Sequence, residues 1–492
     1  MEKKTLVSLF CSFILTSLTE AQVLPPAPIP PLPLPKQVEW QKMETYAFVH
    51  YGLNTFTDKE WGYGDADPKM FNPTRMDVEQ WVRTFKAAGM KGVIIVAKHH
   101  DGFAMWPSPL TDYNITRSSY DGPKNKDGKV DVLAELRKAC DKYGLKMGIY
   151  LSPWDRNHAE YGRQAYVDYY HQQLTDLVTN YGPLFEVWLD GANGGDGYYG
   201  GAREKRKIDR RNYYDFPKIH AIIEEHQPDA IIFSDGGPGC RWVGNEHGEA
   251  GIPNWSFLRK NDVYPGYDKS QELGQGHEDG DTWIPAECDV SIRPGWFYHP
   301  KEDDKVKTPE QLADIYYQSV GRNATLLLNF PIDREGRVNA IDSMNAVRFH
   351  QLIEEDLKTD LLRKAKVTAS CERGKKFSAK KLTDGKWDTY WAMPDGVVSA
   401  YLTFTFSKPT KVNRILLQEY IPLGQRVKEF NVDVLIDGKW RYLETGAPFG
   451  NIGYKRILQF ATVETTAIQI YIPDARGPVC LSTIAAYYAP RD

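Results

Sequence analysis

Leu184-Phe185-Glu186-Val187-Trp188-Leu189-Asp190-Gly191-Ala192 is the stretch that decides the fold. This apolar run, rich in branched and aromatic residues, is typical of a strand buried on both faces, and it ends in a carboxylate. In parallel α/β folds, ligands bind at the carboxyl ends of the strands, so Asp190 is predicted to lie at a functional site. The alternative is that Asp190 only opens a turn before Gly191.

Similar apolar runs alternate with amphipathic stretches from residue 39 onward, as in parallel strands joined by crossover helices. Seven or eight such units over roughly 300 residues fit an α/β fold of the (β/α)8 barrel type, irregular in its last third. An open doubly wound sheet is the alternative, but no glycine pattern for phosphate binding follows the first strand. The predicted strands are 45–51, 92–97, 146–151, 184–190, 230–234, 283–290 and 324–329, and the predicted helices are 77–88, 131–143, 164–181, 213–226, 309–321 and 343–360.

The pattern changes after residue 364. Polar and apolar residues alternate in 400–406, 414–419, 429–436 and 468–472, with turn signals such as Asp437-Gly438 between them. This alternation predicts an all-β sandwich over 365–490, following a catalytic domain over 39–362.

The composition is that of a globular chain of two or three domains, with 492 residues of which 41% are hydrophobic and 26% charged. A net charge of −4 gives no support for nucleic acid as a partner. Aromatic residues reach 13% of the chain. Their rings stack on the apolar faces of sugars, although most of them fill cores in any protein.

The first 21 residues are predicted to be a signal peptide. Two lysines precede an apolar stretch over 6–18, and Thr19-Glu20-Ala21 supplies small residues before a cleavage site at Gln22. A proline-rich linker over 22–38 follows, which predicts an extended tether without a fold of its own. No later run is long and apolar enough for a membrane span, so we expect an exported protein, periplasmic or secreted.

Polar and aromatic groups follow several predicted strands where each strand ends. The first ends in His50-Tyr51-Gly52, the second in Lys98-His99-His100-Asp101-Gly102-Phe103, the third in Tyr150 and the fourth in Asp190. Because the carboxyl ends of barrel strands meet at one rim, these groups are expected to converge there. For any single histidine, the alternative is a structural role in the core.

Three histidines and an aspartate also suit a metal-dependent hydrolase, the competing enzyme class. A zinc barrel hydrolase usually carries a His-x-His pair on its first strand, but neither residue 48 nor residue 52 is a histidine. His99 and His100 would point to opposite sides of an extended chain unless a bulge intervenes. The pattern therefore favours chemistry without a catalytic metal or other cofactor.

A glycosidase needs only two carboxyl groups, one nucleophile and one acid/base. Asp190 is the predicted nucleophile, and Glu246, which follows the fifth strand, is the predicted acid/base. We expect partial burial and the charge on Asp190 to raise the pKa of Glu246. Glu249 and Glu287 are the rival acids, although Glu287 reads as a strand residue that braces the site.

Together these motifs resemble the family 29 α-L-fucosidases over most of residues 39–360. The resemblance implies a retaining exo-glycosidase that removes terminal L-fucose through a fucosyl-enzyme intermediate, with Asp190 as the nucleophile. It also implies that His50, Glu60, Trp61, His99, His100, Tyr150, Arg241 and Trp296 bind fucose. The matching segments are Phe48-Val49-His50-Tyr51-Gly52, Asn54-Thr55-Phe56-Thr57, Glu60-Trp61-Gly62, Lys98-His99-His100-Asp101-Gly102-Phe103, Val187-Trp188-Leu189-Asp190-Gly191-Ala192 and Gly295-Trp296-Phe297-Tyr298.

The segment Trp242-Val243-Gly244-Asn245-Glu246 resembles the subgroup that prefers branched α-1,3 and α-1,4 linkages, in which this glutamate is the acid/base. The implied partners are fucosylated oligosaccharides and glycoconjugates of the Lewis type. Tyr198 and Tyr199, in a long insertion, are expected to form a wall that recognises the galactose of a branched acceptor. The alternative is that both tyrosines are solvated and the site recognises fucose alone.

Residues 365–490 resemble a discoidin-like module, the factor 5/8 type C fold used by many carbohydrate-binding modules. The resemblance rests on segments 382–391, 402–406 and 427–430. It implies a jelly-roll sandwich, a structural calcium near Asp384 and Asp388, and a pairing of Cys371 with Cys480. It leaves open whether this domain binds sugar or only buttresses the barrel.

The sequence is therefore compatible with two classes of function. The first is an exported α-L-fucosidase, and the second is a non-catalytic glycan-binding protein on the same fold. The presence of both candidate carboxyl groups favours the enzyme, because a binding descendant would more often have lost one of them.

Overall fold

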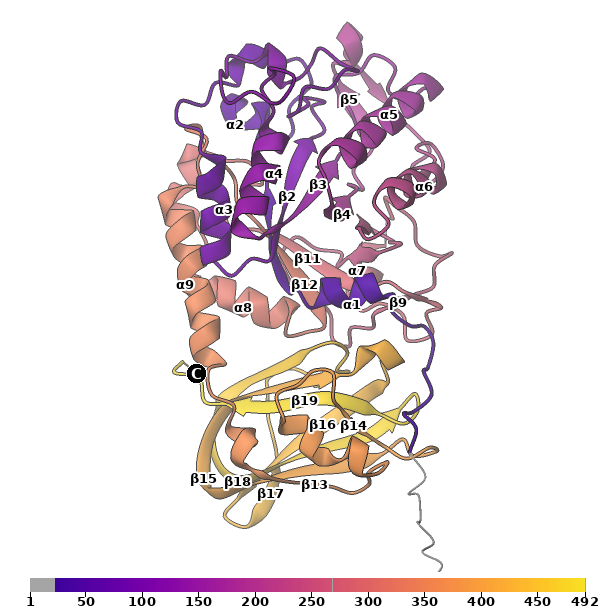
Figure 1. Ribbon diagram of the computed structural model, residues 1–492, viewed down its shortest axis with the longest axis vertical. Coiled ribbons are helices and arrows are strands. Elements are labelled where there is room, and N and C mark those ends of the chain that lie inside the picture. Colours follow the sequence, from indigo (N-terminus) through magenta and orange to yellow (C-terminus); the bar gives the residue numbers. More distant parts are fainter. Residues whose placement is uncertain (1–22, 268, 492) are drawn as a thin grey trace, which may run out of the picture.

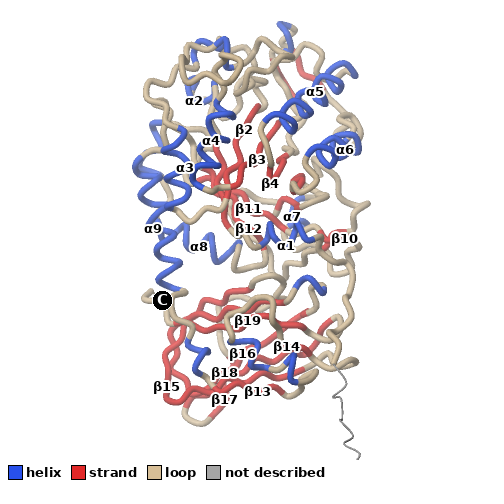
Figure 2. The backbone as a smooth tube through the Cα atoms, in the orientation of Figure 1, coloured by secondary structure: helices blue, strands red, loops and turns tan. Residues whose placement is uncertain are grey.

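A computed structural model describes residues 23–267 and 269–491 as two units joined end to end (Figure 1). The barrel lies above and a strand-rich domain below (Figure 2). The predicted signal peptide over 1–21 lies outside the described residues.

The upper unit is a closed barrel of parallel strands in the order β1-β12-β11-β8-β7-β4-β3-β2. This confirms the predicted (β/α)8 type and excludes the open sheet. The strands are β1 Thr45–Val49, β2 Gly92–Lys98, β3 Lys146–Leu151, β4 Leu184–Trp188, β7 Ile231–Ser234, β8 Cys240–Trp242, β11 Ala286–Ser291 and β12 Ala324–Asn329.

The sequence pattern missed β8, which closes the barrel between β7 and β11. It is only three residues long and follows β7 after a short turn, without a helix. Its parallel pairing, Phe233 with Cys240 and Ala286 with Arg241, involves too few residues to leave a periodic signal. Between β8 and β11 the chain forms only short elements, as expected for an irregular last third: β9 Phe257–Leu258, α7 Ser270–Leu273 and β10 Thr282–Trp283.

Helices cover the outside of the barrel, and most begin where side chains can cap them. Asp77 accepts a hydrogen bond from the Gln80 amide and Asp131 from the Ala134 amide, which satisfies amides at each helix start. The helices are α1 Pro35–Gln41, α2 Leu53–Thr57, α3 Val78–Ala87, α4 Val132–Tyr143, α5 Gln164–Asn180, α6 Phe216–His226, α8 Pro309–Ser319 and α9 Ala340–Asp356, and a small hairpin pairs β5 Gly195–Gly197 with β6 Glu204–Arg206.

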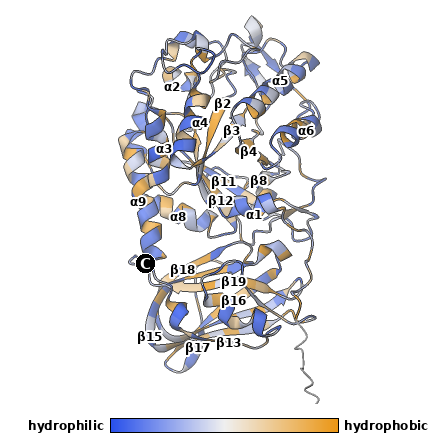
Figure 3. Ribbon diagram, in the orientation of Figure 1, coloured by the Kyte–Doolittle hydropathy of each residue, from blue (hydrophilic) through white to orange (hydrophobic). Residues whose placement is uncertain are grey.

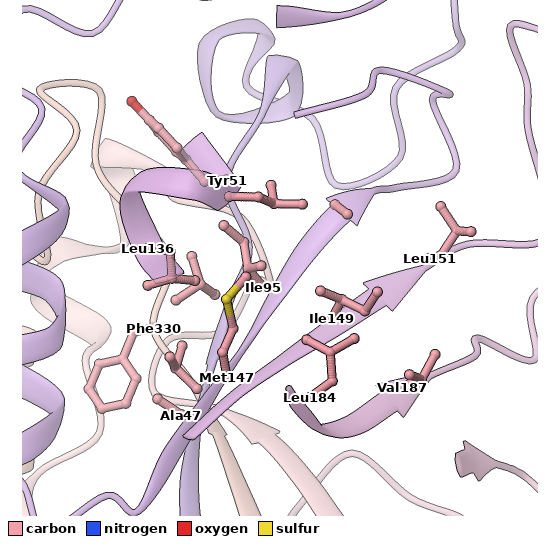
Figure 4. Close-up of a cluster of buried hydrophobic side chains, with 14 of the residues drawn as sticks. Ala47, Tyr51, Ile95, Leu136, Met147, Ile149, Leu151, Leu184, Val187 and Phe330 are labelled. Atoms are coloured by element: carbon pink, nitrogen blue, oxygen red, sulfur yellow. The ribbon is translucent and has the colours of Figure 1, made fainter. Parts of the chain in front are cut away.

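Alternate residues of each barrel strand face opposite layers. Those that face outward, such as Ala47 of β1 and Ile95 of β2, pack against helix side chains such as Leu136 of α4 (Figure 4). Those that face inward, such as Tyr46 and Phe48, form a second cluster inside the barrel. Most barrel strands are therefore largely apolar on both faces, as the orange colour of β2 shows (Figure 3).

Two carboxyl groups lie inside the barrel, Glu186 of β4 and Glu287 of β11, both fully buried. Glu186 accepts a hydrogen bond from the Trp40 indole at 2.8 Å, and Glu287 accepts one from the Trp188 indole at 2.8 Å. The two acids are hydrogen-bonded to each other, and burial raises the pKa of both. Two adjacent charges are unfavourable in such a site, so the pair holds a proton at neutral pH.

This pair makes stability depend on pH. The folded barrel keeps a proton on this pair, whereas the unfolded chain releases it above the ordinary glutamate pKa of about 4.3. The free energy of unfolding therefore falls by about 1.4 kcal/mol for each pH unit above that value. Glu186→Gln has the shape of the protonated acid and cannot ionise, so we expect it to gain stability over the wild type between pH 5 and pH 8. Denaturant unfolding across that range measures the gain, with the exposed Glu39→Gln as control. Equal pH slopes for wild type and Glu186→Gln would contradict the shared proton.

The lower unit is an antiparallel sheet in the order β14-β19-β15-β18-β16-β17, with β13 paired to β15. Register shifts in β15 let this long strand bend, so the domain wraps around its own apolar core and is consistent with the predicted discoidin-like sandwich. Its strands are β13 Lys366–Ala369, β14 Trp391–Ala392, β15 Ala400–Glu419, β16 Val427–Ile436, β17 Lys439–Tyr442, β18 Arg456–Ala475 and β19 Cys480–Tyr487.

One expectation for this domain differs from the structure. Cys371 and Cys480 are free thiols, so the implied disulfide is absent from the described residues. The Asp384 carboxylate accepts hydrogen bonds from the Lys386 amide and the Thr389 hydroxyl, and the Lys381 ammonium lies 3.7 Å away. The structural calcium near Asp384 and Asp388 stays a prediction.

The proline-rich leader is extended as predicted, but it is anchored to the lower domain. Arg426 donates to the Ala27 carbonyl at 2.7 Å, and the Ile29 amide donates to the Leu423 carbonyl at 3.0 Å. The leader then enters α1, where Gln37 donates to two carbonyls beneath the barrel. The barrel unit therefore begins at α1, before the predicted boundary at residue 39.

The described part of the chain contains no helix that is both long and apolar enough to cross a membrane.

Candidate active site

A pocket of about 290 Å³ opens at the carboxyl ends of the barrel strands. Its lining comes from inward-facing residues near the carboxyl ends of several barrel strands and from the loops that follow them. The lining residues are Phe48, His50, Trp61, His99, His100, Tyr150, Trp188, Asp190, Gly191, Ala192, Arg210, Phe233, Asp235, Trp242, Glu246, Gly266, Tyr267, Asp289 and Trp296.

Asp190 follows β4 and presents its carboxylate to this pocket. One oxygen accepts a hydrogen bond from the Tyr150 hydroxyl at 2.9 Å, and the other accepts from the Ala192 amide at 2.6 Å. The side chain is 20% exposed, so a ligand can reach it. A Cβ at Gly191 would collide with the Asp235 carboxylate, so the glycine after Asp190 is required by close packing.

Glu246 lies on the loop after β8 and lines the same pocket. Its carboxylate accepts a hydrogen bond from the Trp296 indole at 3.2 Å. Burial, followed by the charge on Asp190, raises the pKa of Glu246, against the opposing effect of the Trp296 hydrogen bond. Of the rival acids, Glu249 pairs with Arg322 at 2.9 Å and Glu287 lies inside the barrel, so neither lines the pocket.

His50 and His100 present hydrogen-bond acceptors to the pocket. Asn329 donates to the Trp296 carbonyl, so its amide oxygen accepts from His50 Nδ1 at 2.9 Å. Ser152 donates to the Trp154 carbonyl, so its hydroxyl oxygen accepts from His100 Nδ1 at 2.7 Å. Burial lowers the pKa of His50 to about 3 and also lowers that of His100. Both imidazoles are therefore neutral, with Nε2 left to accept from a hydroxyl.

His99 and His100 both line the pocket although they are adjacent in the chain. The pairing of β2 with β3 is shifted between Val96 and Lys98, and the two imidazole centroids lie 4.0 Å apart. β2 ends at Lys98 and the chain then turns, with the Gly102 amide donating to the His99 carbonyl, so the alternation of an extended strand does not apply to His99 and His100. Among the described residues, the one group of His, Cys, Asp and Glu side chains close enough to share a metal is Glu186, Cys240 and Glu287, below the pocket. The pocket histidines do not form such a group.

Aromatic rings shape the mouth and one wall of the pocket. Trp61 is 53% exposed and meets the His100 ring edge-on at 5.2 Å. The Trp296 ring lies 5.2 Å from His50. Flat apolar faces, neutral imidazole acceptors and two carboxyl groups in one small pocket suit a single sugar ring.

Comparison with known proteins agrees with this chemistry. Residues 33–348 match the family model described as Alpha-L-fucosidase, and residues 366–484 match the F5/8 type C domain. The chain belongs to the family 29 α-L-fucosidases. It is an enzyme of this family. Its F5/8 type C domain follows the barrel in the chain.

The similarity extends over nearly the whole chain. Alpha-L-fucosidase 1 of Arabidopsis thaliana is 39% identical over 469 residues, which cover 94% of this chain and 88% of the relative. A glycoside hydrolase 29 family member from an unknown rumen bacterium has a TM-score of 0.84 at 44% identity, covering 94% of this chain and 78% of the other. A Ruminococcus gnavus GH29 fucosidase solved in complex with fucose has a TM-score of 0.83 at 33% identity, covering 95% and 97% of the two chains.

The structure brings eight of the predicted site residues of this fucosidase to the pocket lining. They are His50, Trp61, His99, His100, Tyr150, Asp190, Glu246 and Trp296. Arg241 and Glu60 are not among the lining residues.

Arg241 is a correction to the sequence prediction. Its neighbours on β8, Cys240 and Trp242, face the interior and the pocket, so the alternation of the strand turns Arg241 outward. There its guanidinium is fully buried and donates to the Leu273 carbonyl at 2.8 Å and to the Trp255 carbonyl at 2.9 Å. Arg241 therefore holds the loops behind β8.

Glu60 and the two insertion tyrosines also differ from expectation. The Glu60 carboxylate accepts from the Trp296 amide at 2.8 Å, so it contacts the main chain behind the pocket. Tyr199 is buried and stacks on Tyr161 at 5.5 Å, and neither Tyr198 nor Tyr199 lines the pocket. The predicted tyrosine wall is therefore absent from the pocket lining.

Two further acids of the pocket were missed. Asp235 directly follows β7 and accepts from the Gly266 amide at 2.5 Å, and burial raises its pKa to about 7. Asp289 of β11 accepts from the Trp242 indole at 2.8 Å, and burial raises its pKa. Alternation along β11 from Glu287 could have indicated Asp289. Arg210 and Tyr267 come from long loops, where the sequence carries no such signal.

Proposed function

We propose that this enzyme releases terminal L-fucose with retention of configuration, through two displacements. In the first, an Asp190 oxygen bonds to the anomeric carbon as the glycosidic bond breaks, and the Glu246 proton passes to the leaving oxygen. In the second, Glu246 takes a proton from water, whose oxygen displaces Asp190 and frees fucose. The observation that supports this most is that Asp190 and a Glu246 of raised pKa line one pocket.

The charge state of each group supports its role. Tyr150 and the Ala192 amide both donate to Asp190 and so fix the direction of its two oxygens in the pocket. Glu246 has to be protonated before the first step, and its raised pKa serves this purpose. Once Asp190 is esterified, its charge no longer raises the pKa of Glu246, so Glu246 becomes a better base for the second step.

We further propose that the enzyme prefers α-1,3- and α-1,4-linked fucose in branched glycans of the Lewis type. The resemblance of the segment around Glu246 to that subgroup supports this preference. Because the insertion tyrosines do not line the pocket, we assign contact with the second branch to the wall formed by Arg210, Trp242 and Tyr267. Binding energy from that branch would assist the chemical step.

A panel of three substrates tests the linkage preference. The panel consists of a branched Lewis trisaccharide, an unbranched 2'-fucosylated trisaccharide and a simple aryl fucoside. We expect kcat/KM to be at least about tenfold higher on the branched substrate, with kcat affected as well as KM. Comparable kcat/KM values on all three would show a site that recognises fucose alone. That outcome would remove the subgroup assignment and leave the fucosidase activity in place.

We also propose that the enzyme is exported to the periplasm or secreted, with cleavage of residues 1–21. The charged and apolar pattern of that segment supports this location. The protein recovered outside the cytoplasm should begin at Gln22. Recovery of the full-length chain only from the cytoplasm would contradict the proposal.

A further inference from the structure

The loop after β11 carries Trp296 and is held from behind by Glu60. One Glu60 oxygen accepts from the Trp296 amide at 2.8 Å, and the other accepts from the Phe297 amide at 3.2 Å. On its other side, the Trp296 carbonyl accepts from the Asn329 side chain at 2.9 Å. The main chain of Trp296 is therefore fixed at both its amide and its carbonyl.

His299 in turn holds Glu60. His299 Nε2 lies 2.6 Å from a Glu60 oxygen, and Nδ1 lies 2.8 Å from an Asp58 oxygen. The imidazole is buried, with 6% of its side chain exposed. An imidazole that donates from both nitrogens to two carboxylates carries a positive charge.

The surroundings of His299 favour that charge. Burial alone would lower its pKa, but the hydrogen bonds to Asp58 and Glu60 and the charges of Glu60 and Glu302 outweigh burial and raise it. The nearby cations face Asp58 instead: Arg334 lies 3.7 Å from that carboxylate, and Lys301 also acts on it. The charged form of His299 is thus retained above the ordinary histidine pKa.

The side chains of Asp58, His299 and Glu60 form a clamp on the Trp296 main chain, and Gly295 leaves the space that this clamp needs. A Cβ at Gly295 would lie 2.6 Å from a Glu60 oxygen and 3.0 Å from His299 Cδ2. A side chain there would push both groups away from the Trp296 amide. The glycine is therefore required by close approach.

The geometry points to His299 as a positioning residue. Charged between Asp58 and Glu60, it holds the Glu60 carboxylate in hydrogen-bond contact with the Trp296 main chain. That contact fixes the Trp296 indole where it donates to Glu246. The indole donates to Glu246 at 3.2 Å, which ends the chain of contacts at the acid/base. This inference rests on the proposed role of Glu246. It gives Glu60 a positioning role through its contacts with the Trp296 and Phe297 amides.

The consequence is specific to proton donation. Loss of the clamp frees Trp296 and leaves Glu246 without a partner that fixes its orientation toward the leaving oxygen. A leaving group that needs protonation should then suffer, whereas one that departs unaided should not. The Trp296 hydrogen bond also lowers the pKa of Glu246, so its loss should raise that pKa.

The test is a double-mutant cycle of His299→Gln and Trp296→Phe, in which the second substitution keeps an aromatic ring but removes the indole N–H. For His299→Gln we expect kcat/KM on natural glycans to fall at least about tenfold, and on an activated aryl fucoside by less than about threefold. The alkaline limb of its pH profile should move to higher pH. The double variant should lose no more than Trp296→Phe alone, because both act through one contact. His350→Gln, a histidine 3.5 Å from Glu354 on α9, is the matched control.

Gly295→Ala provides a second route if His299→Gln does not fold, since it displaces the clamp without removing a hydrogen-bonding group. It should reproduce both the selective loss on glycans and the pH shift. Equal losses on both substrates, an unmoved alkaline limb or additive effects in the cycle would overturn the inference. If only the proposed role of Glu246 is wrong, Glu246→Ala will instead hydrolyse glycans at the wild-type rate, so the two failures are distinguishable.

Discussion

Asp190→Ala is expected to lower kcat on every fucoside by at least about 10³-fold, because the variant lacks the carboxylate that forms the fucosyl ester in the proposed mechanism. The variant should fold, since Asp190 lies at the rim and contributes no apolar packing to the barrel core. Hydrolysis of both a glycan and an aryl fucoside, together with thermal unfolding, measures the two expectations. Activated substrates should not rescue this variant, because the missing step is bond formation at the anomeric carbon.

Asp190→Asn is the matched control for shape, since the amide keeps the size of the side chain but is a poor nucleophile. A fluorinated fucosyl substrate that forms a stable ester should add its mass to the peptide containing Asp190 in the wild type. It should add no mass to that peptide in Asp190→Asn. Near-normal turnover by Asp190→Ala, or an adduct on another carboxylate, would disprove the assignment.

Glu246→Ala is expected to slow the hydrolysis of natural glycans by about 10²–10⁴-fold, because the leaving oxygen then departs without a proton. The first displacement on an aryl fucoside, whose leaving group needs little protonation, should keep nearly its wild-type rate. Azide should raise the turnover of the variant and yield fucosyl azide of retained configuration, since it occupies the space left by the carboxyl group. Comparison of rates and products on the two substrates makes the measurement.

The pH profile gives an independent check on Glu246. Activity requires its protonated form, so kcat/KM of the wild type should fall as the pH rises through its raised pKa. This alkaline limb should disappear in Glu246→Ala. Glu249→Ala is the matched control, because Glu249 pairs with Arg322 and does not line the pocket. Azide rescue in Glu249→Ala and not in Glu246→Ala would reassign the acid/base.

The barrel interior shows why part of the site was predictable. Tyr46, Phe48 and His50 alternate along β1 toward the pocket, and Glu186, Trp188 and Asp190 do the same along β4. A period of two residues assigns every second side chain to one face, so a strand visible in the sequence also indicates which residue stands at its upper end. The same rule applied to β8 would have turned Arg241 outward, but β8 is too short to be seen.

The loop residues show the opposite case. Glu60 has the right type and the right neighbours for a sugar contact, but it accepts hydrogen bonds from Trp296 and Phe297 and from a histidine 239 residues away. Tyr199 could have faced the acceptor, but it stacks on Tyr161. In both cases the partner decides the direction of the side chain, and the local sequence says nothing about that partner.

The sequence by itself therefore determined the parallel barrel, the all-β second domain and the strand-end positions of Asp190 and the three histidines. Hydrophobic periodicity acts within each segment and needs no distant partner. Only the tertiary structure decided that Glu246 meets the Trp296 indole, that Asp235 lines the pocket, and that Arg241 leaves it. These positions depend on contacts between loops far apart in the chain, which form only when the barrel closes.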